Sequence, residues 1–200
     1  MNKNLKLILL GVLFITLLAG AVVLYDHLGE SIAPEQLVTE SPAPTGDTDP
    51  TNDTTPTGSQ RTAAPDFTVV DMDGNERKLS EFIGKPIILN FWASWCGPCK
   101  MEMPDFDEAY REYGTEIHFL MVNCTTSSRE TMDSAKSLIA DEGFTFPVYF
   151  DTTGEASGLY GAYSIPLTYF IDAEGYLTAY AQGAIDAEVL QTGIDMIYTP

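Results

Sequence analysis

From residue 63 onward, the pattern of apolar and polar positions predicts strands that alternate with helices. Short apolar or alternating runs predict strands at 66–70, 87–91, 117–122, 147–150, 167–171 and 176–181. Helical spacing predicts helices at 98–113, 129–141 and 187–197, with shorter helical segments at 81–83, capped by Ser80, and at 156–160. This order favours an α/β fold with a mixed central sheet and helices on both faces.

Two turn sequences inside this pattern predict hairpins. Asp-Met-Asp-Gly-Asn at 71–75 separates the first strand from a second short strand that leads to Leu79. Asp-Ala-Glu-Gly at 172–175 joins the last two strands in the same way. The domain is therefore expected to begin with an N-terminal β-hairpin and to close with a hairpin and a helix.

Residues 1–25 predict a membrane segment. Leu7–Tyr25 is an uncharged apolar run of nineteen residues, long enough to cross a hydrocarbon core of about 30 Å. Lys3 and Lys6 precede it, which favours a cytoplasmic N-terminus and an extracytoplasmic remainder. The small residues 19–21 also fit a cleaved signal peptide, and a lipoprotein signal would need a cysteine where Ala21 stands. We favour an uncleaved, single-pass anchor; all three alternatives place the domain outside the cytoplasm.

Residues 26–62 predict a disordered tether between this segment and a folded domain at 63–200. The stretch is rich in Pro, Thr, Ser, Gly and acidic residues and has no hydrophobic period. The whole chain has a formal charge of −19 and a pI near 4.1. Such acidity argues against nucleic acid as a partner, because neutralising phosphates requires clustered Lys and Arg.

The pair Cys96 and Cys99 is the strongest chemical signal in the chain. It follows the apolar run at 87–91 and precedes a predicted helix, so Cys96 is expected at a helix N-terminus, where backbone N–H groups stabilise a thiolate. A zinc site would need a second pair of ligands. The remaining candidates, Cys124, His27 and His118, form no such pair. We expect redox chemistry and neither a metal nor another cofactor.

The residues around this pair resemble a known family. The stretch Trp95–Met101 is similar to the active-site signature of thioredoxins, and Pro104 stands where the helix of that family kinks. Ala64–Phe67, Leu79-Ser80 and the stretch 84–104 extend the similarity to the TlpA/ResA branch. These are membrane-tethered, extracytoplasmic thiol–disulfide oxidoreductases. The resemblance covers roughly 63–198 and implies a thioredoxin-like fold.

The resemblance also implies roles for single residues. Cys96 would attack a substrate disulfide, and Cys99, one turn into the helix and more buried, would resolve the mixed disulfide. Pro166 matches the cis-proline of the family, Ile165 would pair with the substrate backbone, and Trp95 would border the docking surface.

Glu102 is the candidate proton acceptor for Cys99. It follows Cys99 by three residues and so shares its helix face, and ResA-like proteins resemble each other in carrying a carboxylate there. Many thioredoxins use a buried Asp on the preceding strand, whose match here is Asn90, which cannot titrate. The alternative is a solvated glutamate among the neighbouring acids of the helix.

The partners that the resemblance implies are exported proteins with disulfides, with the haem-binding cysteines of apocytochrome c as the first candidate substrate. A membrane-bound electron donor of the CcdA/DsbD type would re-reduce the dithiol. Two alternatives stay open. The first is a peroxidase of the peroxiredoxin type, which shares the sequence pattern at 64–67 where the domain begins, but Ala93 stands where a peroxiredoxin has a threonine before its reactive cysteine. The second is a copper-binding module of the Sco type, which needs a wider cysteine spacing and a downstream histidine ligand.

Four further residues carry weaker expectations. Trp92 is expected in the core and Cys124 as a small buried hydrophobe, with a third redox role as its alternative. His118 is expected to pack in its strand. Tyr163 would either line the groove beside Pro166 or pack as an ordinary core tyrosine.

Overall fold

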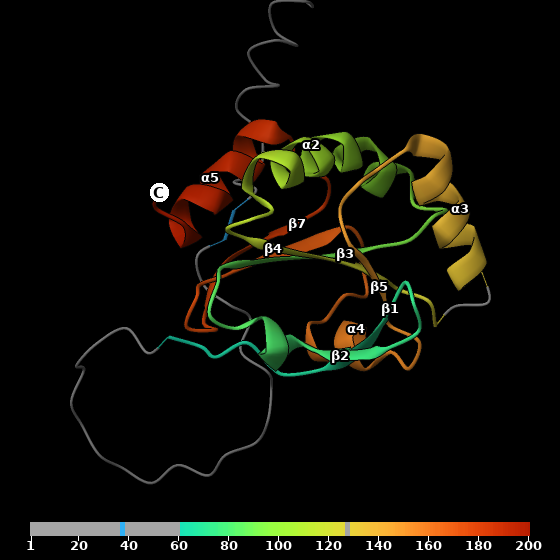
Figure 1. Ribbon diagram of the computed structural model, residues 1–200, viewed down its shortest axis with the longest axis horizontal. Helices are drawn as coiled ribbons and strands as arrows, with labels where there is room; N and C mark the ends of the chain where they lie inside the picture. The colour runs from blue at the N-terminus through green and yellow to red at the C-terminus, as the bar shows by residue number, and fades with distance from the viewer. Residues whose placement is uncertain (1–36, 39–60, 127–128) are drawn as a thin grey trace, which may run out of the picture. The chain divides into compact units, whose positions relative to one another are not determined.

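A seven-stranded mixed sheet organises the computed structural model, which describes residues 37–38, 61–126 and 129–200 (Figure 1). The strand order across the sheet is β2-β1-β5-β4-β3-β6-β7. The strands are β1 Thr68–Asp71, β2 Glu76–Lys78, β3 Ile87–Trp92, β4 His118–Asn123, β5 Val148–Phe150, β6 Leu167–Ile171 and β7 Leu177–Gln182. β3, β4 and β5 are parallel, and the outer strands pair antiparallel.

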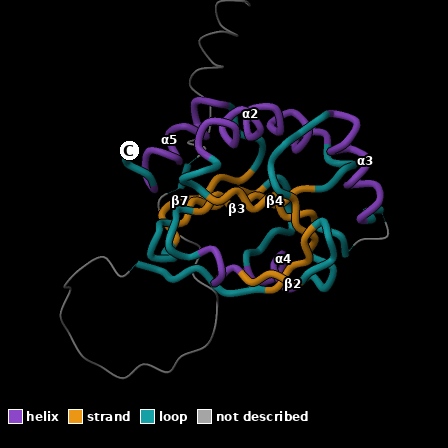
Figure 2. Tube along the Cα trace, in the orientation of Figure 1, coloured by secondary structure: helices purple, strands orange, loops and turns teal. Residues whose placement is uncertain are grey.

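Helices cover both faces of this sheet. They are α2 Gly97–Tyr113, α3 Met132–Glu142, α4 Glu155–Leu159 and α5 Ala187–Ile197, with a 3₁₀ helix, η1, at Leu79–Phe82. Figure 2 shows α2, α3 and α5 above the sheet and α4 below it. The α/β class, the helices on both faces and the β1–β2 hairpin at the start of the domain confirm the prediction from the sequence.

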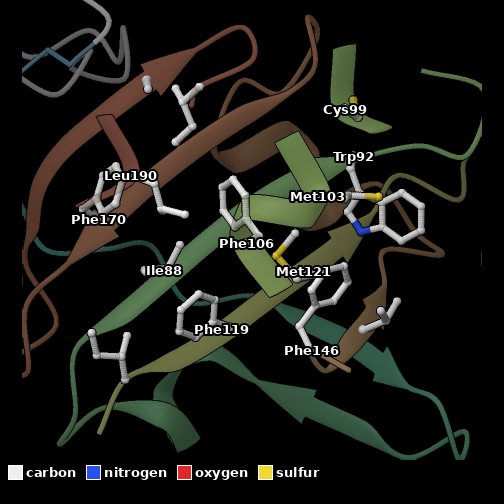
Figure 3. Close-up of a cluster of buried hydrophobic side chains, with 14 of the residues drawn as sticks. Ile88, Trp92, Cys99, Met103, Phe106, Phe119, Met121, Phe146, Phe170 and Leu190 are labelled. Atoms are coloured by element: carbon white, nitrogen blue, oxygen red, sulfur yellow. The ribbon is translucent and has the colours of Figure 1, made fainter. Parts of the chain in front are cut away.

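β3 lies near the middle of the sheet and is buried along its whole length. Ile88 and Trp92 face α2, where they pack in one cluster with Met103 and Phe106 (Figure 3). The alternate positions, such as Leu89, belong to the cluster on the opposite face. A strand with a core on both sides reads as a continuous apolar run, which explains why the sequence marks β3 so clearly. The strand delivers the chain directly to the start of α2.

The predicted boundaries of two helical segments need correction. α3 begins at Met132 because the Thr131 side chain accepts a hydrogen bond from the Ser134 N–H and so caps the helix, which excludes the expected start at 129. It ends at Glu142, and the C-cap residue Gly143 has a left-handed φ of 73°. The 3₁₀ helix begins at Leu79, so Ser80 lies inside it and is not its cap.

The predicted membrane segment 1–25 and most of the predicted tether 26–62 lie outside the described residues. Within the tether, Val38 exchanges two backbone hydrogen bonds with Tyr180 on the edge strand β7, at 2.8 and 3.0 Å. Thr62 and Ala63 pair with the start of the same strand. No helix in the described part of the chain combines the length and the apolar character that crossing a membrane requires.

Candidate active site

Cys96 and Cys99 form a disulfide at the N-terminus of α2, with their Cα atoms 5.3 Å apart. Cys96 is the N-cap residue, and its Sγ accepts a hydrogen bond of 3.2 Å from the Cys99 N–H. After reduction, the same N–H and the helix dipole are placed to stabilise a Cys96 thiolate. Cys96 keeps 4% of its surface exposed and Cys99 none. The expected order of exposure is therefore confirmed, although Cys96 is more covered than the sequence suggested.

The loop before β6 covers the disulfide. The Ile165–Pro166 peptide bond is cis, as the resemblance implied. The Ile165 carbonyl oxygen lies 3.8 Å from the Cys96 Sγ, which explains why this sulfur is so well covered. The Pro166 carbonyl in turn accepts a hydrogen bond of 2.9 Å from the N–H of Gly183, the residue after β7, and this contact holds the loop in place.

Trp95 forms an exposed rim next to Cys96. Its side chain is 43% exposed, as expected for a residue at a docking surface. The guanidinium of Arg129 lies 4.4 Å from the ring centroid, a cation–π arrangement. Arg129 precedes α3, so the segment between β4 and α3 contacts the active-site loop directly.

Glu102 lies on the buried face of α2 and is not a solvated surface residue. Only 2% of it is exposed. Its Oε1 accepts a hydrogen bond of 2.8 Å from the Asn90 side-chain amide, and its Oε2 accepts one of 3.0 Å from the Ile185 N–H. Burial raises the pKa of Glu102 to about 7, and the two hydrogen bonds limit that rise. The group therefore exchanges protons in the neutral range, as a proton acceptor for a thiol requires.

Glu130 is a buried carboxylate that sequence reasoning missed. It accepts hydrogen bonds from the Ser94 N–H at 2.9 Å, from the Ser94 hydroxyl at 2.7 Å and from the Asn123 amide at 2.7 Å. These contacts tie the loop that carries Trp95 and Cys96 to the end of β4. The one feature of the sequence that could have pointed to Glu130 is its place directly before Thr131, the residue that caps α3.

Replacing Glu130 by alanine should lower the free energy of unfolding by about 2 kcal/mol, because one buried donor, on Asn123, and two partly buried donors, on Ser94, lose their acceptor. Urea unfolding of the oxidised protein measures this effect. Glu142→Ala, at an exposed position at the end of α3, is the matched control and should change stability by no more than about 0.5 kcal/mol. Equal stability of the two variants would show that the Glu130 contacts contribute nothing.

The remaining candidates have different outcomes. Trp92 is fully buried, as expected, and His118 begins β4 and packs edge-on against the Phe82 ring. Tyr163 is 88% exposed, so the alternative of a packed core tyrosine is wrong. Cys124 is a free, half-buried thiol whose pKa burial raises to about 11, which makes it a poor nucleophile at neutral pH.

Together, the sheet, the disulfide at a helix N-terminus and the cis-proline loop beside it define a thioredoxin-fold thiol–disulfide oxidoreductase. Comparison with known proteins narrows this class. Residues 61–180 match the AhpC/TSA family model. The chain is 31% identical over 137 residues to the thiol-disulfide oxidoreductase ResA of Geobacillus thermodenitrificans, covering 68% of this chain and 76% of that relative. The chain belongs to the AhpC/TSA family, among the ResA thiol–disulfide oxidoreductases.

Two solved structures support the same assignment. The thioredoxin Etrx1 of Streptococcus pneumoniae, described as an exposed lipoprotein, is 33% identical, with a TM-score of 0.55 over 66% of this chain and 99% of that one. StoA of Bacillus subtilis is 26% identical, with a TM-score of 0.57 over 66% of this chain and 98% of that one.

Proposed function

We propose that this protein reduces disulfide bonds of exported proteins, outside the cytoplasm, through the Cys96–Cys99 dithiol. The observation that carries the proposal is the position of the pair, at a helix N-terminus that stabilises the Cys96 thiolate. Glu102, buried one turn further along α2, supplies a group that takes up a proton near neutral pH.

The proposed reaction moves two electrons from the dithiol to the substrate. The Cys96 thiolate attacks one sulfur of the substrate disulfide, that bond breaks, and the departing sulfur takes up a proton. Cys99 passes its proton to Glu102 and attacks the Cys96 Sγ. The mixed disulfide breaks, the second substrate sulfur leaves as a thiolate and is protonated, and the Cys96–Cys99 disulfide remains. Trp95 and the backbone of Ile165, beside Pro166, would hold the substrate against Cys96.

The location and the partners in this proposal come from the N-terminal sequence and from the family. Leu7–Tyr25 would anchor the chain in the cell membrane with its N-terminus in the cytoplasm, and residues 26–62 would tether the domain on the outer side. A membrane-bound donor of the CcdA/DsbD type would return electrons to the dithiol. Apocytochrome c, with its paired haem-binding cysteines, is the first substrate to test.

The reduction potential of the Cys96–Cys99 couple tests the direction of electron flow. We expect a value near or below roughly −250 mV when the full chain is equilibrated in detergent with thiol/disulfide buffers at pH 7. A value near roughly −120 mV is typical of a strong oxidant and would contradict the proposal. Peroxide consumption or copper binding by the same sample would instead support one of the two alternative functions.

A further inference from the structure

Asn90 is a polar residue inside the apolar strand β3. It is fully buried, and its neighbours along the strand are all apolar. In the antiparallel pairing of β3 with β6, Asn90 lies directly opposite Thr168, which is also fully buried. A buried amide is costly unless it is hydrogen-bonded, so the contacts of this side chain indicate what it does.

The Asn90 amide donates to two acceptors. Its Nδ2 lies 2.8 Å from the Glu102 Oε1 and 2.9 Å from the Thr168 Oγ1, and these two contacts use both amide hydrogens. The Oδ1 of Asn90 is buried and accepts no hydrogen bond from any described residue. The opposite amide orientation would turn Oδ1 toward the Glu102 carboxylate, where two acceptors repel. The observed orientation therefore leaves one acceptor unused in order to present both donors.

Glu102 has few other groups that favour its charged form. The Ile185 N–H, from the segment before α5, donates to Oε2. β3 and β6 contribute only the neutral side chains of Asn90 and Thr168. On α2 itself, Asp105 opposes a second negative charge, and Cys99 titrates only when the disulfide is reduced. Among the residues that the structure describes, Glu102 forms no ion pair, so hydrogen bonds must hold its ionised form.

We infer that Asn90 is a positioning residue for the dithiol reaction: its amide keeps the buried Glu102 carboxyl able to release and take up a proton, and Thr168 orients that amide. The inference rests on the proposed role of Glu102 as the proton acceptor. Without the Asn90 donor, only the Ile185 N–H would oppose the effect of burial, and the carboxyl would stay protonated at neutral pH. It could then no longer accept the Cys99 proton.

Carbon-13 NMR titration of the Glu102 carboxyl in the oxidised full chain tests this directly, because neither Cys96 nor Cys99 titrates in that state. In Asn90→Leu we expect the pKa of Glu102 to rise by about one to two units, as the loss of a hydrogen bond to a charged group predicts. Thr168→Val should give a smaller rise of up to about one unit. Thr168→Ser keeps the hydroxyl, so the pKa of Glu102 in this variant should equal that in the wild type.

A second readout separates positioning from a general packing defect. When the reduction potential is plotted against pH, its slope changes near the pKa of Glu102. In Asn90→Leu this change of slope should occur at a higher pH. This change of slope should be absent from Glu102→Gln. Adding Asn90→Leu to Glu102→Gln should leave the pH dependence of the reduction potential as it is in Glu102→Gln alone. A further change in the double variant would show that Asn90 acts through packing and would overturn the inference.

An unshifted Glu102 titration in Asn90→Leu would also overturn it. If Asn90→Leu does not fold, Thr168→Val decides, since it alters only the acceptor that orients the amide. These outcomes are distinct from those of the proposed function. An oxidising reduction potential would contradict the proposed direction of electron flow but would not affect the titration of Glu102. An unshifted pKa of Glu102 in Asn90→Leu would contradict the role of Asn90 but would not affect the conclusion from the reduction potential.

Discussion

Replacing Cys96 by serine should lower the rate of disulfide exchange by roughly 10³-fold or more, because the attacking sulfur is lost. Cys99→Ser should instead still attack a substrate and then stop, since no second thiol remains beside Cys96 to resolve the mixed disulfide. Non-reducing gel electrophoresis after incubation with a disulfide-bonded substrate should show this covalent complex for Cys99→Ser and not for Cys96→Ser.

Cys124→Ser is the matched control for these variants. Its thiol is half-buried and lies outside the Cys96–Cys99 disulfide, so the variant should exchange disulfides at the wild-type rate. A trapped complex that formed in Cys96→Ser and not in Cys99→Ser would reverse the assigned roles of the two active-site cysteines. Loss of activity in Cys124→Ser would revive the third redox role that the sequence left open.

Replacing Glu102 by glutamine should change how stability depends on pH. Burial raises the pKa of Glu102 from 4.5 to about 7 in the folded protein. Between these values the folded state holds a proton that the unfolded state has released, so the free energy of unfolding falls as pH rises and levels off above pH 7. The contribution of this group to that fall is about 3 kcal/mol, at about 1.4 kcal/mol per pKa unit.

Urea unfolding of the oxidised protein at a series of pH values measures this effect. The stability of Glu102→Gln relative to the wild type should rise by about 3 kcal/mol across the same pH window. Glu108→Gln, at an exposed position on the same helix, is the matched control and should follow the wild-type curve. If the difference between Glu102→Gln and the wild type stays constant with pH, Glu102 titrates in the folded state as it does in the unfolded state.

The elements that could be predicted best are those that local sequence determines. α5 runs over Ala187–Ile197, as predicted, because Asp186 caps it and its apolar residues repeat with the helical period. Cys96 and Cys99 could be placed for the same reason, since a strand, a turn and a helix start follow one another directly. By contrast, the start of α3 depends on a reciprocal contact between Thr131 and Ser134, which several nearby polar residues could equally have made.

The surroundings of the disulfide could not be read from local sequence, because they depend on contacts between distant segments. Glu130 is turned inward by Ser94, which lies 36 residues earlier. Asn90 could be recognised as polar within an apolar run, but its function depends on Thr168, 78 residues later, and on Glu102. The resemblance to a known family supplied Glu102 and Pro166, and the pattern of apolar residues alone would not have singled out either one.

The pairing of β3 with β6 has a consequence for a chain that is still being synthesised. Glu102 bonds to the backbone of Ile185, 83 residues further along, and Asn90 is oriented by Thr168. A chain that has emerged only as far as α3 already carries both cysteines but lacks both of these partners. Without these partners Asn90 and Glu102 cannot complete their hydrogen bonds, so the proposed proton acceptor for Cys99 is assembled only when the last quarter of the domain is present. The segment from β6 to the start of α5 is thus required to complete the contacts around Glu102.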